Sequence, residues 1–277
     1  MSDSRVIWYT PRKLKDPLAV IGFPSVGLVS SIVTSFIARE LRMTMAAGIT
    51  APELPPYALI QGGTPYPQIR VYVTRPNRKT AAAPAAAEPI PAEGTEVASA
   101  PAKTAKKSKA PLPILGRDLV IVTSEVAPKP EQTYEIVQNL IEVLKKLGVR
   151  ETVCLEGIPK FNEETAMLAV ATTPAMRKLA AKTLGVRPMD EGLVRGATGV
   201  MLYEGAAAKS DVLALLCPAS PQFPDPRAAS ALLEPLSKLV PGLKLDTTPL
   251  FKEAEEIDQR IKSEQQQENT SAQQIYG

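Results

Sequence analysis

Short apolar runs alternate with stretches of helical spacing along most of the chain. Residues 18–21 form an apolar run that ends in a Gly-Phe-Pro turn, and apolar residues then recur every three or four positions over 29–41. This pattern predicts a buried strand, a tight turn and an amphipathic helix. A second run at 119–123 precedes an apolar stripe over 136–147. The alternation favours an α/β protein whose sheet carries helices on its faces.

Further strands are predicted from short apolar or β-branched runs at 43–49, 57–60, 68–74, 153–155, 168–170 and 212–217. Prolines and the pair Gly62-Gly63 separate the first three of these runs. Proline and glycine interrupt regular structure, so they mark the breaks between these strands. We therefore expect an antiparallel part of the sheet in this region.

Three helices are predicted to begin in the same way, at Thr173-Pro174, Asp225-Pro226 and Thr248-Pro249. In each pair the first residue supplies a side-chain acceptor at the N-cap, and proline occupies the first helical position, where its missing N–H costs nothing. A glycine-rich segment, 192–199, precedes a further apolar helix.

Two segments differ in composition from the rest. Residues 75–115 are dominated by Ala, Pro and Lys and contain no aromatic residue, so they are predicted to be a disordered loop inserted between two strands. A basic cluster within them (Lys103, Lys106, Lys107 and Lys109) is interpreted as solvated, because aromatic residues are absent and Glu88, Glu93 and Glu96 compensate its charge. The expected organisation is one α/β/α domain, 1–264, followed by a tail, 265–277.

The last predicted helix runs from Pro249 to about Gln266 and has only a narrow apolar seam, formed by Leu250, Ala254, Ile257 and Ile261. It is expected to lie on the surface or to pair with another protomer. Beyond it the sequence is polar until Ile275-Tyr276-Gly277. A flexible tether of about 10 residues would give these last residues a reach of roughly 30 Å.

Composition and charge narrow the class of protein. The 277 residues are 44% hydrophobic and 22% charged, which is enough apolar material for a sizeable core. No apolar run approaches the roughly 20 residues that cross a bilayer, and Met1-Ser2-Asp3-Ser4 does not begin a signal peptide, so a cytoplasmic protein without membrane contact is expected. A formal net charge of +3 is too small to indicate nucleic-acid binding.

Metal and cofactor chemistry receives little support from the sequence. Cys154 and Cys217 have no second Cys or His at ligand spacing and are interpreted as core residues. The chain contains no histidine, which removes the commonest general base and metal ligand. No cofactor is predicted. Trp8 and Tyr9, beside Val6 and Ile7, are interpreted as filling an edge of the core.

Several segments in order resemble the family of the second proteasome assembly chaperone and its archaeal homologues. They are the turn Gly22-Phe23-Pro24-Ser25-Val26-Gly27, residues 51–56, 67–72 and 119–125, and the glycine-rich 192–199. The likeness covers roughly 18–261 without the insertion. It implies a three-layer α/β/α fold similar to purine nucleoside phosphorylases, homo-oligomerisation, and a chaperone or adaptor role around proteasome α subunits.

The C-terminus matches a second pattern, hydrophobic-Tyr-any at the last three positions, which is found on proteasome activators. The terminal carboxylate would pair with a lysine between α subunits, the Tyr276 ring would be buried and Ile275 would fill an adjoining apolar surface. A single tail would bind weakly, so an oligomer that presents several tails would gain from effective concentration. Ile275, Tyr276 and Gly277 are therefore the predicted partner-binding residues.

The glycine-rich turn at 22–27 has a second interpretation. A turn of this kind that leads into a helix can bind phosphate through backbone N–H groups. Pro24 argues against phosphate, because it removes a donor and blocks close approach, so a tight structural turn is favoured. Gly22, Phe23, Pro24, Ser25 and Gly27 thus form either a pocket or a structural joint.

Enzymatic activity is the alternative of a different class. Ser25 is a candidate nucleophile, and Glu125, Glu156, Asp190 and Glu191 are expected near strand ends or in loops, where α/β proteins place catalytic groups. No base for Ser25 is identifiable, and serine at a helix start is more often a cap. The preferred hypothesis is a self-associating chaperone or ATP-independent activator that binds the proteasome α-ring, with an adaptor for another complex or a nucleoside-binding or phosphate-binding enzyme as alternatives.

Overall fold

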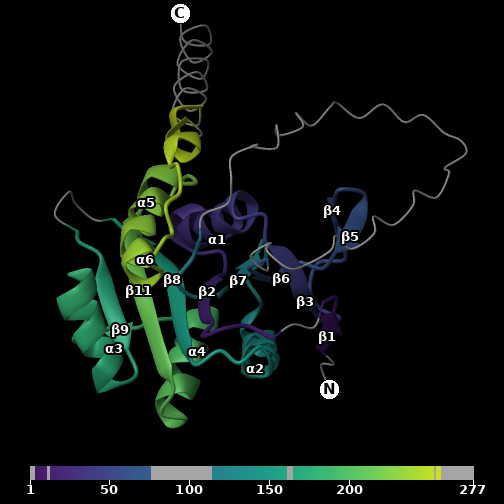
Figure 1. Cartoon of the computed structure of the whole chain (residues 1–277), viewed down its shortest axis with the longest axis horizontal. Coiled ribbons are helices and arrows are strands. Elements are labelled where there is room, and N and C mark those ends of the chain that lie inside the picture. The colour runs from purple at the N-terminus through teal and green to yellow at the C-terminus, as the bar shows by residue number, and fades with distance from the viewer. Residues whose placement is uncertain (1–3, 11–12, 76–113, 161–164, 253, 257–277) are drawn as a thin grey trace, which may run out of the picture.

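A nine-stranded mixed sheet forms the middle layer of the protein (Figure 1). The computed structural model describes residues 4–10, 13–75, 114–160, 165–252 and 254–256. Across the sheet the strands follow the order β1 (Arg5–Trp8), β3 (Thr44–Thr50), β6 (Ile69–Val73), β7 (Leu119–Ser124), β2 (Leu18–Gly22), β8 (Glu151–Pro159), β11 (Asp211–Ala219), β9 (Leu168–Ala171) and β10 (Arg187–Pro188).

The centre of the sheet is parallel. All five residues of β2 are buried, and β2 pairs residue for residue with β7 on one side and β8 on the other. The strands predicted at 153–155 and 212–217 exist but are longer than expected: β8 and β11 pair over nine residues each. Polar or proline residues such as Thr152, Glu156 and Pro218 interrupt the apolar runs in the sequence without interrupting the ladder.

The two flanks of the sheet contain antiparallel pairs. β6 pairs antiparallel with β7, β3 with β6, and β1 with β3, which confirms the predicted antiparallel region. On the opposite flank β9 is antiparallel to β11 and parallel to β10. The interpretation of Trp8 and Tyr9 as core residues is wrong: they lie on or just after the edge strand β1 and are 37% and 38% exposed.

A separate β-hairpin replaces the strand predicted at 57–60. Its strands are β4 (Leu59–Gln61) and β5 (Thr64–Tyr66), which pair with each other and not with the large sheet. Gly62 and Gly63 form the two-residue turn with φ values of 58° and 78°. Two consecutive positive φ angles suit a tight hairpin turn and favour glycine at both positions.

Helices cover both faces of the sheet. One face packs against α1 (Val29–Glu40), α3 (Pro174–Lys178), η2 (Leu179–Leu184), α5 (Pro226–Ala231) and α6 (Leu233–Leu239). The other face packs against α2 (Pro130–Lys146) and α4 (Gly196–Ala207). The two apolar clusters lie on opposite sides of the sheet, which confirms a three-layer α/β/α arrangement. The specific likeness to purine nucleoside phosphorylases stays a prediction.

Two of the three predicted helix starts are confirmed. The Thr173 side chain accepts a hydrogen bond from the Met176 N–H, and the Asp225 side chain accepts one from the Ala228 N–H. The third helix begins one residue early, at Thr248.

That third helix is capped differently from the prediction. The Thr247 carbonyl accepts the first helical bonds, and Asp246 rather than Thr248 supplies the side-chain acceptor, at 3.0 Å from the Thr248 N–H. Leu250 and Ala254 are buried, as the apolar seam predicted, whereas Ile257 and Ile261 lie outside the described residues.

Three further predictions concern the two cysteines, membrane-spanning helices and the division into one domain and a tail. Cys154 and Cys217 are free and buried, as expected of core residues, and burial raises the pKa of both thiols. Within the described residues no helix is both long and apolar enough to cross a bilayer. Most of the predicted insertion, 76–113, and the tail, 265–277, lie outside the described residues, so the division into one domain and a tail stays a prediction.

Candidate functional site

The Gly-Phe-Pro turn lies at the carboxyl end of the central strand, where it joins β2 to α1 through the short 3-10 turn η1 (Val26–Leu28). A β-carbon at Gly22 would overlap the carbonyl group of Ser30 in α1. Gly27 has a φ of 63°, and a β-carbon there would meet that of Ala219 at 2.7 Å. Glycine is therefore required at both positions by close packing and by backbone conformation.

Ser25 is held inside this joint by neutral partners. Its Oγ accepts a hydrogen bond from the Gly157 N–H at 2.9 Å and lies 2.6 Å from Ser30 Oγ, which in turn donates to the Phe23 carbonyl. The prediction that Ser25 caps the helix is wrong, because its side chain makes no capping hydrogen bond to a backbone N–H of the helix. The hydroxyl instead ties the turn to β8, and no ionisable side chain is among these partners.

Phe23 closes the end of the central strand on the other face of the sheet. Its side chain is 5% exposed and belongs to the apolar cluster under α2 and α4. Ligands of doubly wound sheets bind beyond the carboxyl ends of the strands, at the place where the connections diverge to the two faces. A buried phenylalanine at the end of the central strand favours the structural interpretation of the turn.

The candidate carboxylates Glu125 and Glu156 flank this turn but lie on opposite faces of the sheet. Gly22 pairs with Thr123 of β7 and with Leu155 of β8, so each glutamate stands one or two residues beyond a partner of the same glycine. Glu125 contacts a side chain of the α1 face, as described below, whereas Glu156 accepts a hydrogen bond from Thr198 of α4 at 2.6 Å. The two carboxylates therefore do not form an acid–base pair.

Glu156 has the most perturbed carboxyl group among the described residues. Burial raises its pKa to about 7, and the hydrogen bond from Thr198 opposes this shift only in part. Asp190 and Glu191 are exposed between β10 and α4, and none of the described contacts joins them to Ser25. The described residues contain no group of three or more Cys, Asp or Glu side chains that could hold a metal ion.

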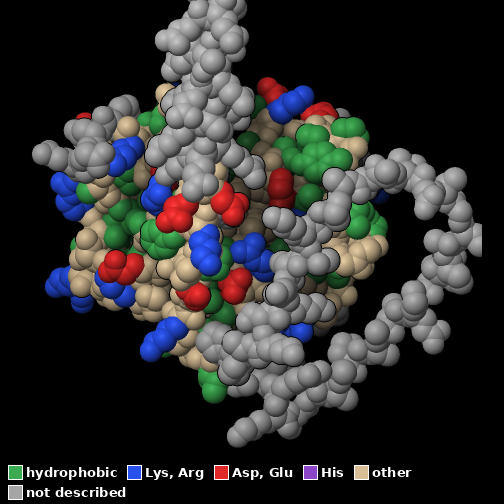
Figure 2. All heavy atoms as spheres, turned by 90° about the horizontal axis from the view of Figure 1, so that it is seen from above, with side chains coloured by type: hydrophobic (Ala, Val, Ile, Leu, Met, Phe, Trp, Pro, Cys, Tyr) green, Lys and Arg blue, Asp and Glu red, His purple; other side chains and the backbone are tan. Residues whose placement is uncertain are grey.

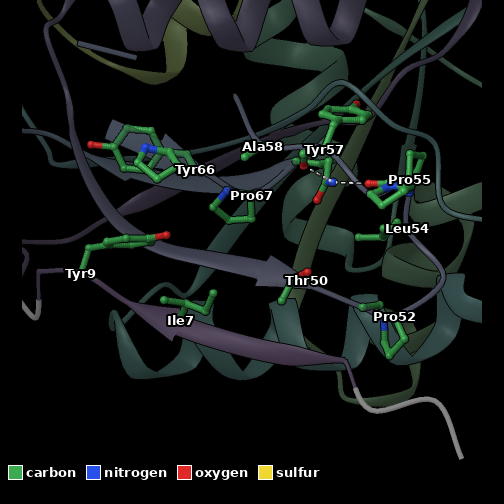
Figure 3. A pocket seen from close by; sticks show the side chains of 14 residues that line it. Ile7, Tyr9, Thr50, Pro52, Leu54, Pro55, Tyr57, Ala58, Tyr66 and Pro67 are labelled. Atoms are coloured by element: carbon green, nitrogen blue, oxygen red, sulfur yellow. Dashed lines mark hydrogen bonds between the residues drawn. The ribbon is translucent and has the colours of Figure 1, made fainter. Parts of the chain in front are cut away.

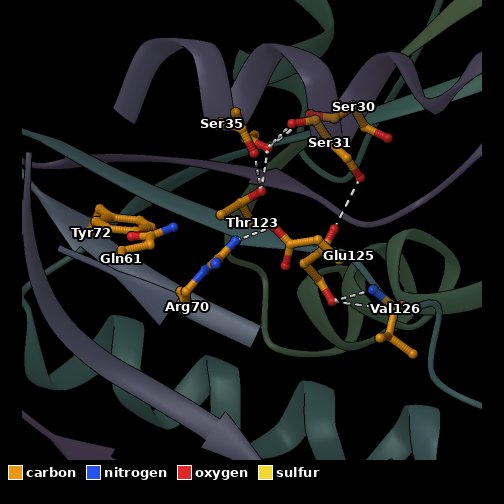
Figure 4. A network of polar contacts seen from close by, with 11 residues as sticks. Ser30, Ser31, Ser35, Gln61, Arg70, Tyr72, Thr123, Glu125 and Val126 are labelled. Atoms are coloured by element: carbon orange, nitrogen blue, oxygen red, sulfur yellow. Dashed lines mark hydrogen bonds and ion pairs between the residues drawn. The ribbon is translucent and has the colours of Figure 1, made fainter. Parts of the chain in front are cut away.

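A polar cluster lies between α1 and the β6–β7 part of the sheet (Figure 4). We call it the arginine cluster; it consists of Arg70, Thr123, Glu125, Ser31 and Ser35. Arg70 Nη2 donates to Glu125 Oε1, and the Arg70 side chain is 3% exposed while that of Glu125 is 38% exposed. Ser31 Oγ donates to the Ser124 carbonyl at 3.1 Å, and Ser35 Oγ lies 3.1 Å from Thr123 Oγ1.

The remaining donors of Arg70 are not satisfied by the described residues. Its Nε and Nη1 atoms are buried without a hydrogen-bond partner there, and its guanidinium carbon lies 5.9 Å from the centre of the Tyr72 ring. Burial raises the pKa of the Tyr72 hydroxyl, which donates to Gln61 of the hairpin at 3.1 Å. A buried guanidinium with unsatisfied N–H groups is costly, by about 1–3 kcal/mol for each donor.

A groove lies at the β1 edge of the sheet, beneath the hairpin, and Figure 3 shows tyrosine and proline side chains around it. Its volume is about 470 Å³, and it is lined by Ile7, Tyr9, Thr50, Ala51, Pro52, Leu54, Pro55, Pro56, Tyr57, Ala58, Pro65, Tyr66, Pro67 and Gln68. Gln68 Nε2 donates to the carbonyls of Pro55 and Tyr57, which fixes the loop that forms one wall. No lining residue is charged, so the groove offers contact area rather than acid–base groups.

Neither the arginine cluster nor the groove was predicted from the sequence as a site. Arg70 alternates with the buried Ile69, Val71 and Val73, a pattern that normally indicates a solvent-facing position. The groove draws its residues from three separated segments, 7–9, 50–58 and 65–68. The proline-rich stretches at 51–56 and 65–67 were the only signal, and each by itself predicts just a loop.

The face from which the C-terminal helix leaves the core carries both signs of charge. Figure 2 shows acidic and basic side chains intermixed on this face, without a broad patch of either sign among the described residues. Nucleic acid binds surfaces on which Lys and Arg are gathered. The face shown in Figure 2 has no such gathering among the described residues, and the prediction about nucleic acid stays a prediction. The predicted partner-binding residues Ile275, Tyr276 and Gly277 lie outside the described residues.

Comparison with solved structures identifies chains of the same fold. PbaA of Pyrococcus furiosus, described as an archaeal homolog of proteasome-assembly chaperone, is 23% identical with a TM-score of 0.71, and the match covers 98% of this chain and 95% of PbaA. PbaB of the same organism, described as an archaeal proteasome activator, is 20% identical with a TM-score of 0.71 over 96% of this chain and all of PbaB.

Sequence comparison agrees with the structural matches. An uncharacterized protein of Methanocaldococcus jannaschii, MJ0106, is 22% identical over 250 residues, which are 90% of this chain and 86% of that protein. The model of the PAC2 family matches residues 19–265, which include the central strand, its turn and the helices of both faces. The protein therefore belongs to the PAC2 family.

Proposed function

We propose that this protein is a proteasome assembly chaperone or ATP-independent activator that binds the α-ring of the core particle through Ile275-Tyr276-Gly277. Family membership carries the proposal, together with the descriptions of PbaA as a homolog of proteasome-assembly chaperone and of PbaB as a proteasome activator. The hydrophobic-Tyr-any ending of the sequence supplies the contact. The protein would work in the cytoplasm and would need no cofactor.

The start of the last helix provides a firm base for such a tail. Leu250 and Ala254 are 1% and 2% exposed, and Leu250 belongs to the same apolar cluster as Leu236 and Leu239 of α6. Figure 1 shows this helix leaving the molecule on the side of α5 and α6. A terminal peptide attached to a fixed base loses less freedom on binding than one attached to a loose chain.

Self-association would raise the affinity for the α-ring above that of a single tail. A contact of three residues cannot by itself give high affinity, because ordering the tail costs free energy. Several tails presented together to a ring bind at high effective concentration. The side chain of Phe251 is 44% exposed beside the buried Leu250, on the helix for which pairing with another protomer was one of the two predicted arrangements.

Binding of purified archaeal-type core particle to immobilised protein tests the proposal. Three forms are compared: the intact chain, a chain that lacks Ile275-Tyr276-Gly277, and Tyr276→Ala. We expect binding to fall at least tenfold in both altered forms, since the ring and the terminal carboxylate are the specific contacts. Gln273→Ala, a neighbouring change outside the motif, is the matched control and should bind like the intact chain.

Two results would overturn the tail mechanism. Equal binding by the truncated chain would place the contact elsewhere on the protein. Absence of binding by all forms, including the intact chain, to core particle and to free α subunits would favour an adaptor for another complex. Circular dichroism of each form confirms that the fold is unchanged, because the altered residues lie beyond the packed start of the helix.

A further inference from the structure

The arginine cluster contains the features of a ligand site rather than of an ordinary ion pair. Arg70 is the second residue of β6 and projects into the space beneath α1, where its side chain is 3% exposed. A buried guanidinium remains charged at every physiological pH, so it needs acceptors for its five N–H groups. Structural arginines usually meet this need with carbonyl groups or with a two-point carboxylate.

Arg70 has one described acceptor, the Oε1 atom of Glu125, which binds Nη2. The Nε and Nη1 atoms are buried and have no partner among the described residues. The guanidinium therefore offers donors in more directions than Glu125 satisfies. An anion with several oxygen atoms could accept more of these hydrogen bonds than the single oxygen of Glu125 does.

Glu125 lies over Arg70 in a way that allows it to be displaced. Its side chain is 38% exposed, so the carboxylate can move into water without losing its solvation, whereas the guanidinium cannot follow. Glu125 comes directly after the last residue of β7, Ser124, and is not part of the strand ladder. Movement of this side chain would uncover Arg70 while the sheet stays intact.

Hydroxyl groups surround the same place, as Figure 4 shows. Ser31 and Ser35 of α1 lie above the strand end and currently bond to the Ser124 carbonyl and to Thr123 Oγ1. Tyr72 stands on the other side, with its ring 5.9 Å from the guanidinium carbon. Hydroxyls can turn to donate to an incoming anion, and the neutral surroundings leave Arg70 and Glu125 as the charges that face each other.

We propose that the arginine cluster binds a small oxyanion, a carboxylate or a phosphate, which takes the place of Glu125 on Arg70. Glu125 then acts as an internal competitor: its carboxylate occupies the guanidinium until an anion of suitable geometry replaces it. A cation is excluded by the charge of Arg70. No covalent step is involved, and the site is independent of the C-terminal tail.

Thermal unfolding in the presence of inorganic phosphate, at constant ionic strength, tests this proposal. Phosphate that binds the folded protein raises the midpoint in a saturable way. We expect Glu125→Gln to bind phosphate at least tenfold more tightly than the unaltered protein, since the competitor is neutral. Arg70→Met should abolish the saturable response. Acetate in parallel distinguishes a site for carboxylates from one that needs the additional oxygens of phosphate.

NMR spectroscopy tests the proposal independently of any change that the substitutions make to the stability of the protein. In the 1H–15N NMR spectrum of Glu125→Gln, the Nε–H resonance of Arg70 should shift progressively with phosphate concentration. Equal phosphate responses in Arg70→Met and the unaltered protein, or a Glu125→Gln variant that responds to neither anion, would overturn the proposal. The same small, non-saturable rise in all forms would also overturn it, because it would reflect general salt effects.

Discussion

Two polar regions lie side by side at the carboxyl edge of the sheet, and they differ in how their polar groups are satisfied. In the turn after β2, the Ser25 and Ser30 hydroxyls and the Gly157 N–H bond to one another, and the glycines leave no room for further atoms. In the arginine cluster after β7, Arg70 is buried with two nitrogen atoms unpartnered among the described residues. Close packing and internal hydrogen bonds thus favour a structural joint at the glycine-rich turn, whereas the less conspicuous strand arginine keeps unsatisfied donors among the described residues.

The largest expected effect tests the closed turn. A β-carbon at Gly157 would overlap the Val26 carbonyl and approach Ser25 Oγ at 3.1 Å, and backbone cannot move aside cheaply. Gly157→Ala should therefore lower the free energy of unfolding by about 4 kcal/mol, at the upper end of single-residue effects. Urea unfolding measures it. A loss below about 1 kcal/mol would show that the turn has free space and does not differ from the arginine cluster in this respect.

The second prediction concerns the difference in burial between Arg70 and Glu125, the two charged residues of the arginine cluster. Glu125→Gln leaves a buried charge without its counter-ion and should cost about 3 kcal/mol. Arg70→Met removes the buried charge, and the half-exposed Glu125 can hydrate, so this change should cost less than about 1 kcal/mol. Urea unfolding of both variants in buffer without phosphate gives the comparison. Equal costs would mean that the pair behaves as an ordinary surface salt bridge.

A smaller effect is expected for Glu156, whose carboxylate lies on the face of the sheet that α4 covers. The pKa of Glu156 is raised to about 7 in the folded protein, above its ordinary value of 4.5, so the folded state holds the proton more tightly than the unfolded state. Stability contributed by this proton is present below pH 4.5 and is lost as the pH rises toward 7. Glu156→Gln keeps the acceptor for Thr198 and should be more stable than the unaltered protein by about 2 kcal/mol at pH 8.

The control is the pH dependence of the difference in free energy of unfolding between Glu156→Gln and the unaltered protein. The advantage of Glu156→Gln should shrink as the pH falls from 8 to 4.5, because the native glutamate is then protonated as well. Chemical unfolding at several pH values measures this difference. An advantage that does not vary with pH would assign the effect to packing and not to ionisation.

Local patterns in the sequence predicted much of the fold. The apolar run before the Gly-Phe-Pro turn and the run at 119–123 became β2 and β7, and Thr173 and Asp225 cap helices as expected. Strand lengths were underestimated where a polar residue such as Glu156 sits inside a buried ladder. The edge strand β1 was missed because its exposed Ile7 and Trp8, like Tyr9 just after it, resemble core residues in sequence.

The polar sites were harder to predict because they depend on contacts between distant segments. Gly157 is 132 positions from Ser25, and Glu125 is 55 positions from Arg70. The sequence named Ser25 and Glu125 but could not reveal that the first has neutral partners and the second covers a buried arginine. Ile275, Tyr276 and Gly277 were predicted from a pattern at the chain end, and their role stays a prediction.

The most direct test of the tail mechanism is competition by a synthetic peptide of residues 268–277 for binding between the intact protein and the proteasome core particle. We predict that the peptide with a free carboxylate displaces the protein and that the same peptide with an amidated C-terminus is at least tenfold weaker. Displacement by neither peptide at millimolar concentration, while intact protein stays bound, would contradict the claim that Ile275-Tyr276-Gly277 makes the contact.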